Sequence, residues 1–136
     1  EIEQERKSAV FDLLNIGKFK LINKNKTGPY KINIKLLEWK LILRVIDLSD
    51  DAITDLKISI SSVRRIIRDY QIVCDNYVEA IKTAPLKKIE AIDIGRRTIH
   101  DEGAGMLLEA FKEKVELDMD TARRLFTLVS IISIKI

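Results

Sequence analysis

The chain has 136 residues, of which 46% are hydrophobic and 33% charged, a balance typical of a folded globular domain rather than of a disordered segment. Its net charge of +3 is smaller than the positive charge that dedicated nucleic-acid modules concentrate. Cys74, the single cysteine, excludes an internal disulfide and a multi-cysteine zinc site, and favours a reducing compartment. The longest apolar run, residues 125–136, is shorter than the roughly 20 residues that span a bilayer. We therefore expect a cytoplasmic protein with no membrane partner and one domain over residues 1–136.

The first segment, residues 1–16, has apolar residues at a helical recurrence and ends before Gly17, a good helix stop. This pattern predicts an N-terminal helix. A short apolar stretch from Phe19 to Ile22 then fits a strand, and the Asn- and Lys-rich residues 23–29 form the clearest loop of the chain.

From Tyr30 to Ile60 apolar residues alternate with polar ones in three segments that short turns separate. Such alternation predicts a three-stranded antiparallel meander with one buried face, within a sheet region that covers residues 19–60. The opposite face would carry a basic set, which we take as a candidate polyanion face: Lys31, Lys35, Lys40, Arg44 and Lys57.

Residues 61–136 follow a helical period, and a long apolar stripe from Val63 to Ile81 predicts a helix of about six turns lying across the sheet. Pro85 separates this helix from the next, in which Gly103 and Gly105 predict a kink or a break. Asp118 or Asp120 would cap a last helix. We therefore predict an α+β fold: a small three-stranded meander packed on one face by a C-terminal helical layer, with an N-terminal helix.

Six of the nine arginines form three pairs, and each pair lies in a segment with a helical pattern: Arg64-Arg65, Arg96-Arg97 and Arg123-Arg124. Arginine differs from lysine in its rigid planar fork, which grips a carboxylate or a phosphate with two bonds at once. The pairs therefore indicate a need for geometry and not for charge alone.

Arg96 falls on the apolar side of its helix, where an unpaired charge would cost several kcal/mol. One interpretation is an internal bridge to a carboxylate of a neighbouring helix, with Asp75, Asp118 or Asp120 as the partner. The alternatives are an anion pocket with Arg97 and His100, or an Arg96 side chain that reaches solvent. The candidate polar cluster comprises Tyr70, Tyr77, Asp93, Arg96, Arg97, His100, Asp118, Asp120, Arg123 and Arg124.

His100 is the only histidine, and no second histidine lies at the spacing of a zinc helix, so we expect no metal site. A hydrogen-bonded structural role is the main interpretation of His100, with acid–base chemistry as the alternative. Cys74 lies on the long apolar stripe and is expected to be a buried small hydrophobe. Phosphate-binding glycine motifs are absent from the sequence, and we expect no cofactor.

The basic sheet face lacks the outward aromatic residues on which RNA-binding sheets stack bases. A solvated lysine face is the main interpretation, and contact with a phosphate backbone is the alternative. Ile42 and Ile46 also point outward, so this face is a candidate to meet the first helix or a second subunit.

Four stretches together resemble the alphaproteobacterial uncharacterised protein family 0262. They are Gly28-Pro-Tyr30, Arg64-Arg-Ile-Ile-Arg-Asp-Tyr70, residues 89–97 with His100-Asp-Glu-Gly103, and residues 118–128. The likeness covers nearly the whole chain and departs from the family pattern in the loop before Gly28 and the Ile-rich tail after Leu128. It implies a bacterial cytoplasmic protein and carries no established activity.

These observations predict a non-catalytic binding or adaptor protein that acts on an unknown protein partner or on a second copy of itself. One alternative is binding of RNA or another polyanion through the Lys-rich sheet face, with Arg64 and Arg68 contributing. The other is an anion-binding enzyme centred on Arg96, Arg97 and His100.

Overall fold

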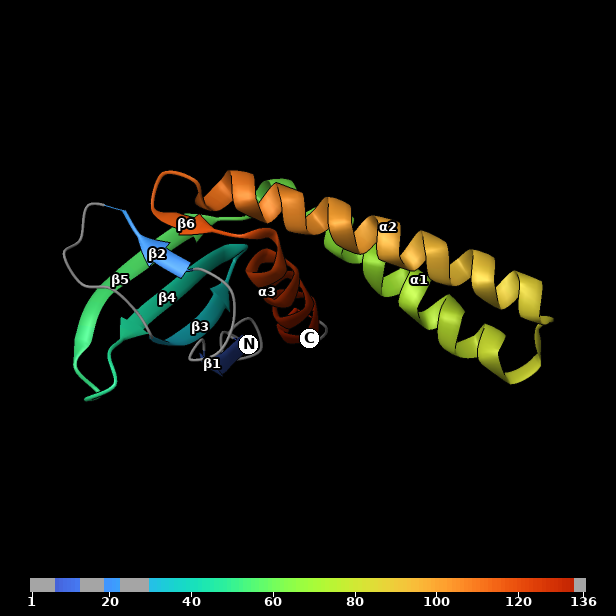
Figure 1. The fold of residues 1–136 in the computed structure, drawn as a ribbon, viewed down its shortest axis with the longest axis horizontal. Coiled ribbons are helices and arrows are strands. Elements are labelled where there is room, and N and C mark those ends of the chain that lie inside the picture. Colours follow the sequence, from blue (N-terminus) through green and yellow to red (C-terminus); the bar gives the residue numbers. More distant parts are fainter. Residues whose placement is uncertain (1–6, 13–18, 23–29, 134–136) are drawn as a thin grey trace.

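A computed structural model of the chain describes residues 7–12, 19–22 and 30–133. Within these ranges it confirms the predicted α+β class, with one four-stranded antiparallel sheet, a separate two-stranded sheet and three α-helices (Figure 1). The strands are β1 (Lys7–Asp12), β2 (Phe19–Leu21), β3 (Lys31–Leu37), β4 (Lys40–Ile46), β5 (Ala52–Ser59) and β6 (Val115–Leu117). The helices are the 3₁₀ turn η2 (Ser61–Val63), α1 (Arg64–Thr83), α2 (Leu86–Phe111) and α3 (Met119–Ile132).

The predicted N-terminal helix is wrong over its described part, because residues 7–12 form β1. This strand pairs antiparallel with β3, with Lys7 opposite Leu36 and Phe11 opposite Ile32. Pairing with the open edge of β3 satisfies backbone groups that a helix would have satisfied internally. The rest of the predicted helix, and the predicted loop at residues 23–29, lie outside the described residues.

The predicted meander is confirmed as β3, β4 and β5, and it forms the larger sheet in the order β1-β3-β4-β5. Residues alternate along these strands as predicted, and Ile34 and Leu43 are fully buried opposite each other. The strand predicted at residues 19–22 exists as β2, which leaves this sheet and pairs with β6. The three residues of β6 interrupt the half of the chain that was predicted to be helical, since such a short strand has no periodicity to detect.

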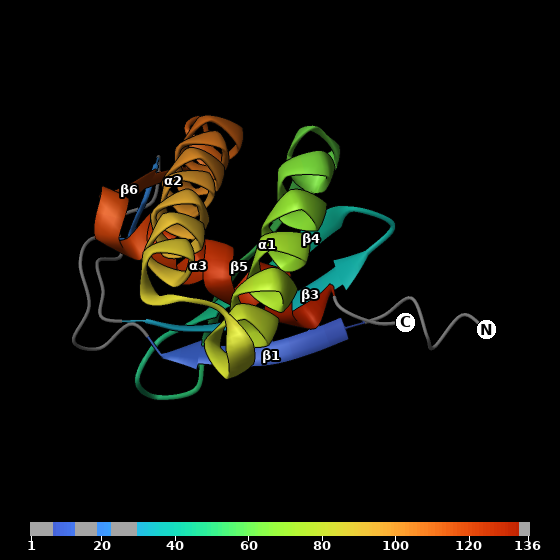
Figure 2. The ribbon, with the colours of Figure 1, turned by 90° about the vertical axis from the view of Figure 1, so that its right-hand side faces the viewer.

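The helical layer over the sheet consists of α3 and the C-terminal end of α2, which bury Leu107, Phe111 and Phe126 against the strands. The first helix, α1, does not lie across the sheet as expected. It buries Ile66 and Ile67 near the core, and then projects beyond the sheet alongside α2 (Figure 1). Seen along this direction, α1 and α2 lie side by side with α3 and the strands beyond them (Figure 2). We call the projecting part, residues 72–100, the arm.

The expected kink at Gly103 and Gly105 is wrong, because α2 runs without a break from Leu86 to Phe111. Gly103 lies at the crossing of α2 and α3, where a Cβ atom would come within 2.2 Å of the Phe126 ring. The glycine is therefore required by close packing between helices and not by a change of direction. Asp118 caps α3 as one of the two predicted candidates, since its side chain accepts a bond of 2.9 Å from the Thr121 amide.

Candidate functional site

The predicted polar cluster is centred on Asp93 of α2, which both arginines of the middle pair bind. Arg96 Nε lies 3.1 Å and Arg97 Nε 3.2 Å from the two oxygens of this carboxylate. The Arg96 guanidinium also lies over the ring of Tyr77, 5.1 Å from its centroid, and so connects α2 to α1. Arg96 thus has an internal carboxylate partner, but this partner belongs to its own helix and is none of the three that the sequence suggested.

The electrostatics of this group follow from these contacts. The hydrogen bond from Arg96 holds the pKa of Asp93 below its ordinary value, and the same bond raises the pKa of Arg96. Burial raises the pKa of the neighbouring Tyr70, which interacts with Cys74 and Arg96. These groups therefore keep their ordinary protonation states at neutral pH, with Asp93 charged and Tyr70 neutral.

His100 is held between α1 and α3. Its Nε2 lies 2.7 Å from Thr127 Oγ1, and its ring packs edge-on against Tyr70 and Phe126, with centroid distances of 5.2 and 5.3 Å. Burial lowers the pKa of His100, so the imidazole is neutral at pH 7. The ring therefore fills and joins the crossing of three helices.

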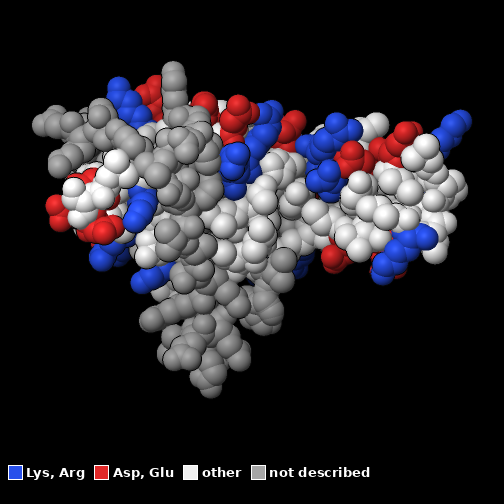
Figure 3. All heavy atoms as spheres, turned by 60° about the horizontal axis from the view of Figure 1, so that its bottom comes forward, with Lys and Arg blue, Asp and Glu red and all other residues white. Residues whose placement is uncertain are grey.

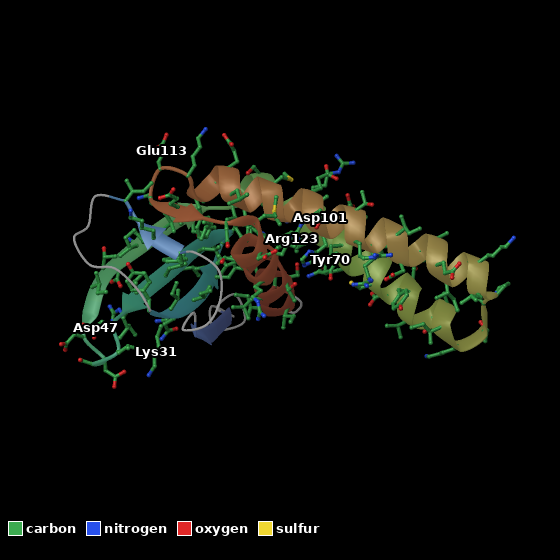
Figure 4. All side chains as sticks on the ribbon, viewed as in Figure 1. Lys31, Asp47, Tyr70, Asp101, Glu113 and Arg123 are labelled. Atoms are coloured by element: carbon green, nitrogen blue, oxygen red, sulfur yellow. The ribbon has the colours of Figure 1, made fainter. Side chains whose placement is uncertain are left out.

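The third arginine pair divides between two environments. Arg123 of α3 donates to Asp101 of α2 at 2.8 Å and to Asp120 at 2.9 Å, close to Tyr70 at the same helix crossing (Figure 4). Arg124 is exposed and forms no ion pair with a described residue. The predicted cluster therefore combines ion pairs within α2 and α3 with braces between helices, and Asp118 caps α3.

The structure places the five basic residues of the sheet on one face, as the alternation predicted, but carboxylates neutralise two of them. Arg44 donates to both oxygens of Asp55, at 3.0 and 3.1 Å, and Lys31 lies 3.3 Å from Asp50. The remaining three, Lys35, Lys40 and Lys57, form no ion pair within the described ranges. On the arm, in the view of Figure 3, basic and acidic side chains are interspersed around uncharged surface.

A cavity that the sequence did not indicate lies between α1, α3 and the turn that joins β3 to β4. Its volume is about 770 Å³, within the range of small-molecule sites. Trp39 contributes from the turn and Arg64 and Arg68 from the start of α1. The remaining wall includes Tyr70, Gln71, Cys74, Asp75, Thr127, Ser130, Ile131 and Ser133.

Arg64 and Arg68 lie one turn apart on α1, and neither forms an ion pair with a described residue. The first turn of α1 contains no acidic residue and its start has no side-chain cap. The positive end of the helix dipole therefore adds to the two guanidinium charges instead of being offset. Arg64 lies over the Trp39 ring, 5.4 Å from its centroid, so the aromatic face holds this cation at the cavity.

The β3–β4 turn is strained at the residue that faces this cavity. Glu38 and Trp39 have φ angles of 52° and 63°, the left-handed conformation that a two-residue turn of the I′ type requires. Asn and Gly favour such turns, whereas a residue with a bulky side chain pays about 1–2 kcal/mol for each left-handed position. Strain of this kind collects at binding sites, where it fixes the direction of a side chain.

The α3 wall of the cavity is polar. Gln71 Nε2 donates to the Ser130 carbonyl and lies within hydrogen-bond distance of Ser133 Oγ, at 3.0 Å in each case. The Ser130 side chain is buried, and its hydroxyl has no hydrogen-bond partner among the described residues. The cavity thus combines two cations, an aromatic ring, hydroxyl groups and one carboxylate, that of Asp75, which forms no ion pair with either arginine.

The family model of an uncharacterised protein family, UPF0262, matches residues 1–135. The chain belongs to this family. Relatives include UPF0262 proteins of Brucella canis and Brucella abortus, each 42% identical over 97% of this chain and 82% of the relative. A UPF0262 protein of Mesorhizobium japonicum is 39% identical with the same coverage. No solved structure matches the chain.

This membership confirms the resemblance that the four sequence motifs carry, and the relatives are bacterial, as it implied. Of the motif at residues 64–70, Arg64, Arg68 and Tyr70 line the cavity. The spacing of four between the two arginines could have indicated a shared helix face, but Glu38-Trp39 has no turn signature, so the opposite wall was not predictable.

Two kinds of feature are absent from the described ranges. None of their helices combines the length and the apolar character that crossing a membrane takes. These ranges also contain no group of three or more His, Cys, Asp or Glu side chains placed so that they could hold a metal ion.

Proposed function

We propose that the chain is a non-catalytic binding protein of the bacterial cytoplasm, and that it binds an anionic small molecule in the cavity between α1 and α3. The observation that carries this proposal is the pair Arg64 and Arg68, which line the cavity without a carboxylate partner among the described residues. Arginine recognises carboxylate and phosphate groups in a planar, two-bond geometry, so an anion is the expected complement.

Four other arginines support this assignment by contrast, while Arg65 and Arg124 are exposed outside the cavity wall and form no ion pair with a described residue. Arg44, Arg96, Arg97 and Arg123 are each bound to an aspartate of the chain itself. Partnering with internal carboxylates is thus the rule where an arginine stabilises the fold. The two arginines of the cavity depart from this rule in a concave site that also offers an aromatic surface and hydroxyl groups.

A binding role has more support than catalysis because the groups best suited to chemistry are engaged in structure. His100 bonds to Thr127 and is enclosed by two aromatic rings. Cys74 lines the cavity beside Tyr70, whose pKa burial raises, so this phenol is a poor base for activating the thiol.

The two alternatives have weaker support. An anion site at Arg96 and Arg97 would compete with Asp93, which both already bind. A polyanion face on the sheet would have to displace Asp55 from Arg44 and Asp50 from Lys31.

The test is calorimetric titration of the protein with inorganic phosphate, citrate and a nucleoside monophosphate. We expect at least one of these anions to bind, and Arg68→Gln to weaken that binding about tenfold or more, because a charge-assisted contact is lost. Arg65→Gln is the matched control, since Arg65 is adjacent, exposed and not part of the cavity wall. Absence of binding by the unmodified protein, or equal losses in both variants, would contradict the proposal.

A further inference from the structure

We propose that β5 is a dimerisation edge: two copies of the chain pair their β5 strands antiparallel about Leu56 and join their four-stranded sheets into one continuous sheet. This inference rests on the strand edge and its charges, and is independent of the cavity.

The edge is long, and among the described strands it has no partner. β5 has eight residues and is the last strand in the order β1-β3-β4-β5, and no described strand pairs with its outer side. It forms the outer margin of the sheet, away from the arm (Figure 1). Such an edge presents a row of unpaired backbone donors and acceptors to any strand of matching geometry.

The register with β4 determines which residues of β5 offer these groups. The Ile60 amide donates to the Trp39 carbonyl at 2.8 Å, so the backbone groups of residue 60 point toward β4. Backbone direction alternates along a strand, so those of Ile58 and Leu56 also point toward β4. The backbone groups of Asp55, Lys57 and Ser59 consequently point to the open side.

With a two-fold axis at Leu56, the outward backbone groups of one copy face the outward backbone groups of the other and can form hydrogen bonds with them. The axis places Asp55 opposite Lys57 of the second copy and Lys57 opposite Asp55 of the second copy. Both pairs belong to the outward set and so form hydrogen-bonded pairs, whereas Leu56 meets its own copy in a non-hydrogen-bonded pair, as the alternation of an antiparallel ladder demands.

The charges select this register. Opposite charges directly across an antiparallel pair stabilise it, and like charges destabilise it. Lys57 is exposed and forms no ion pair with a described residue, while Arg44 binds Asp55 on its other side. Across the junction, Arg44 and Asp55 of one copy would be followed by Lys57 of the second copy, so the charges of neighbouring side chains would alternate in sign. Registers centred on Asp55 or on Lys57 would instead place like charges opposite each other.

Sedimentation equilibrium over a range of protein concentrations tests this dimer. We expect the unmodified protein to dimerise, and Lys57→Glu to raise the dissociation constant about tenfold or more, because two attractive pairs become repulsive. Lys35→Glu is the matched control, since Lys35 is also an exposed lysine of the same sheet face but lies on the inner strand β3. It should leave the dissociation constant unchanged.

A charge exchange between two chains tests the register itself. Asp55→Lys in one chain and Lys57→Asp in another should each weaken self-association, and mixing the two should restore a dimer of the two different chains. Hydrogen exchange of the unmodified protein does not depend on how the variants fold. The Asp55 and Lys57 amides should exchange more slowly as the protein concentration rises. A protein that stays monomeric, a dimer that Lys57→Glu does not affect, or exchange at these amides that is independent of concentration would overturn the proposal.

Discussion

The Nε2 atom of His100 lies 2.7 Å from Thr127 Oγ1, and this contact joins α2 to α3 beneath the ring of Tyr70. Thr127 Oγ1 in turn donates to the Arg123 carbonyl at 3.2 Å. With its proton committed there, the hydroxyl accepts from the histidine, so Nε2 carries the proton of the neutral imidazole. The only histidine of the chain is thereby held in one tautomer by a helix neighbour.

This arrangement predicts a loss of stability in mild acid. Burial lowers the pKa of His100 in the folded chain below its ordinary value of 6.5. As the pH falls below about 6.5, His100 binds a proton in the unfolded chain but stays neutral in the folded chain. The free energy of unfolding therefore decreases. Urea unfolding between pH 7.5 and pH 5 should show this decrease, and His100→Gln should reduce the slope. Equal slopes for the two proteins would exclude the histidine as the cause.

The two arginines that share Asp93 should differ in their contribution to stability. Arg96→Lys removes the planar contact with the Tyr77 ring and the double contact with Asp93, and should lower the free energy of unfolding by about 1–2 kcal/mol. Arg97 is 66% exposed, so Arg97→Lys should change it by less than about 0.5 kcal/mol. Chemical denaturation of both variants measures this contrast, and similar losses would argue against Arg96 as a brace.

The glycines of α2 should respond in opposite directions to alanine. Gly103→Ala places a Cβ against the Phe126 ring and should destabilise the fold by about 1–3 kcal/mol. A Cβ atom at Gly95 would have no neighbouring atom within 4 Å apart from the backbone of its own helix. Gly95→Ala should therefore stabilise the helix by about 0.5–1 kcal/mol. Thermal unfolding with calorimetry can measure both changes. A gain in stability with Gly103→Ala would show that the α2–α3 crossing has room for a Cβ atom, and a loss with Gly95→Ala would contradict the second expectation.

Relief of the strain in the β3–β4 turn should stabilise the fold. Asn tolerates the left-handed conformation that Glu38 adopts at φ 52°, so Glu38→Asn should raise the free energy of unfolding by about 0.5–1 kcal/mol. Glu38→Ala retains a Cβ without the local hydrogen bonding of Asn and serves as the control, with no comparable gain. Urea unfolding of the two variants decides between them; equal gains with Asn and Ala would point to the lost charge instead.

Local patterns predicted those parts of the fold in which burial follows the chain. The alternation of Ile32, Ile34 and Leu36 predicted β3 correctly, because one face of that strand is buried and the other is not. Residues 7–12 were predicted wrongly, since their preference for β1 comes from pairing with β3 and not from their own periodicity. Likewise, the apolar residues Val78 and Ile81 continue the stripe of α1 without lying over the sheet.

The candidate site was less predictable than the fold. The sequence indicated that Arg96 needs a partner, but not that Asp93, three residues earlier, would fill this role. The cavity joins Trp39 to residues of α1 and α3 that are far away in the chain. Such a wall exists only after the helices have packed, so no single segment carries its signal.

In each of the two helices of the arm, the end at the tip is less stable locally than the end that packs in the core. Beyond α3 the two helices pack mainly on each other, and Val78, Ile81 and Leu86 are each more than half exposed. Few apolar contacts therefore oppose a local opening at the α1–α2 turn, whereas Ile67 and Leu107 are released only when the whole domain unfolds. The tip should open and close many times within the lifetime of the folded core, so a protease would first meet the chain at residues 81–86 while the sheet remains intact.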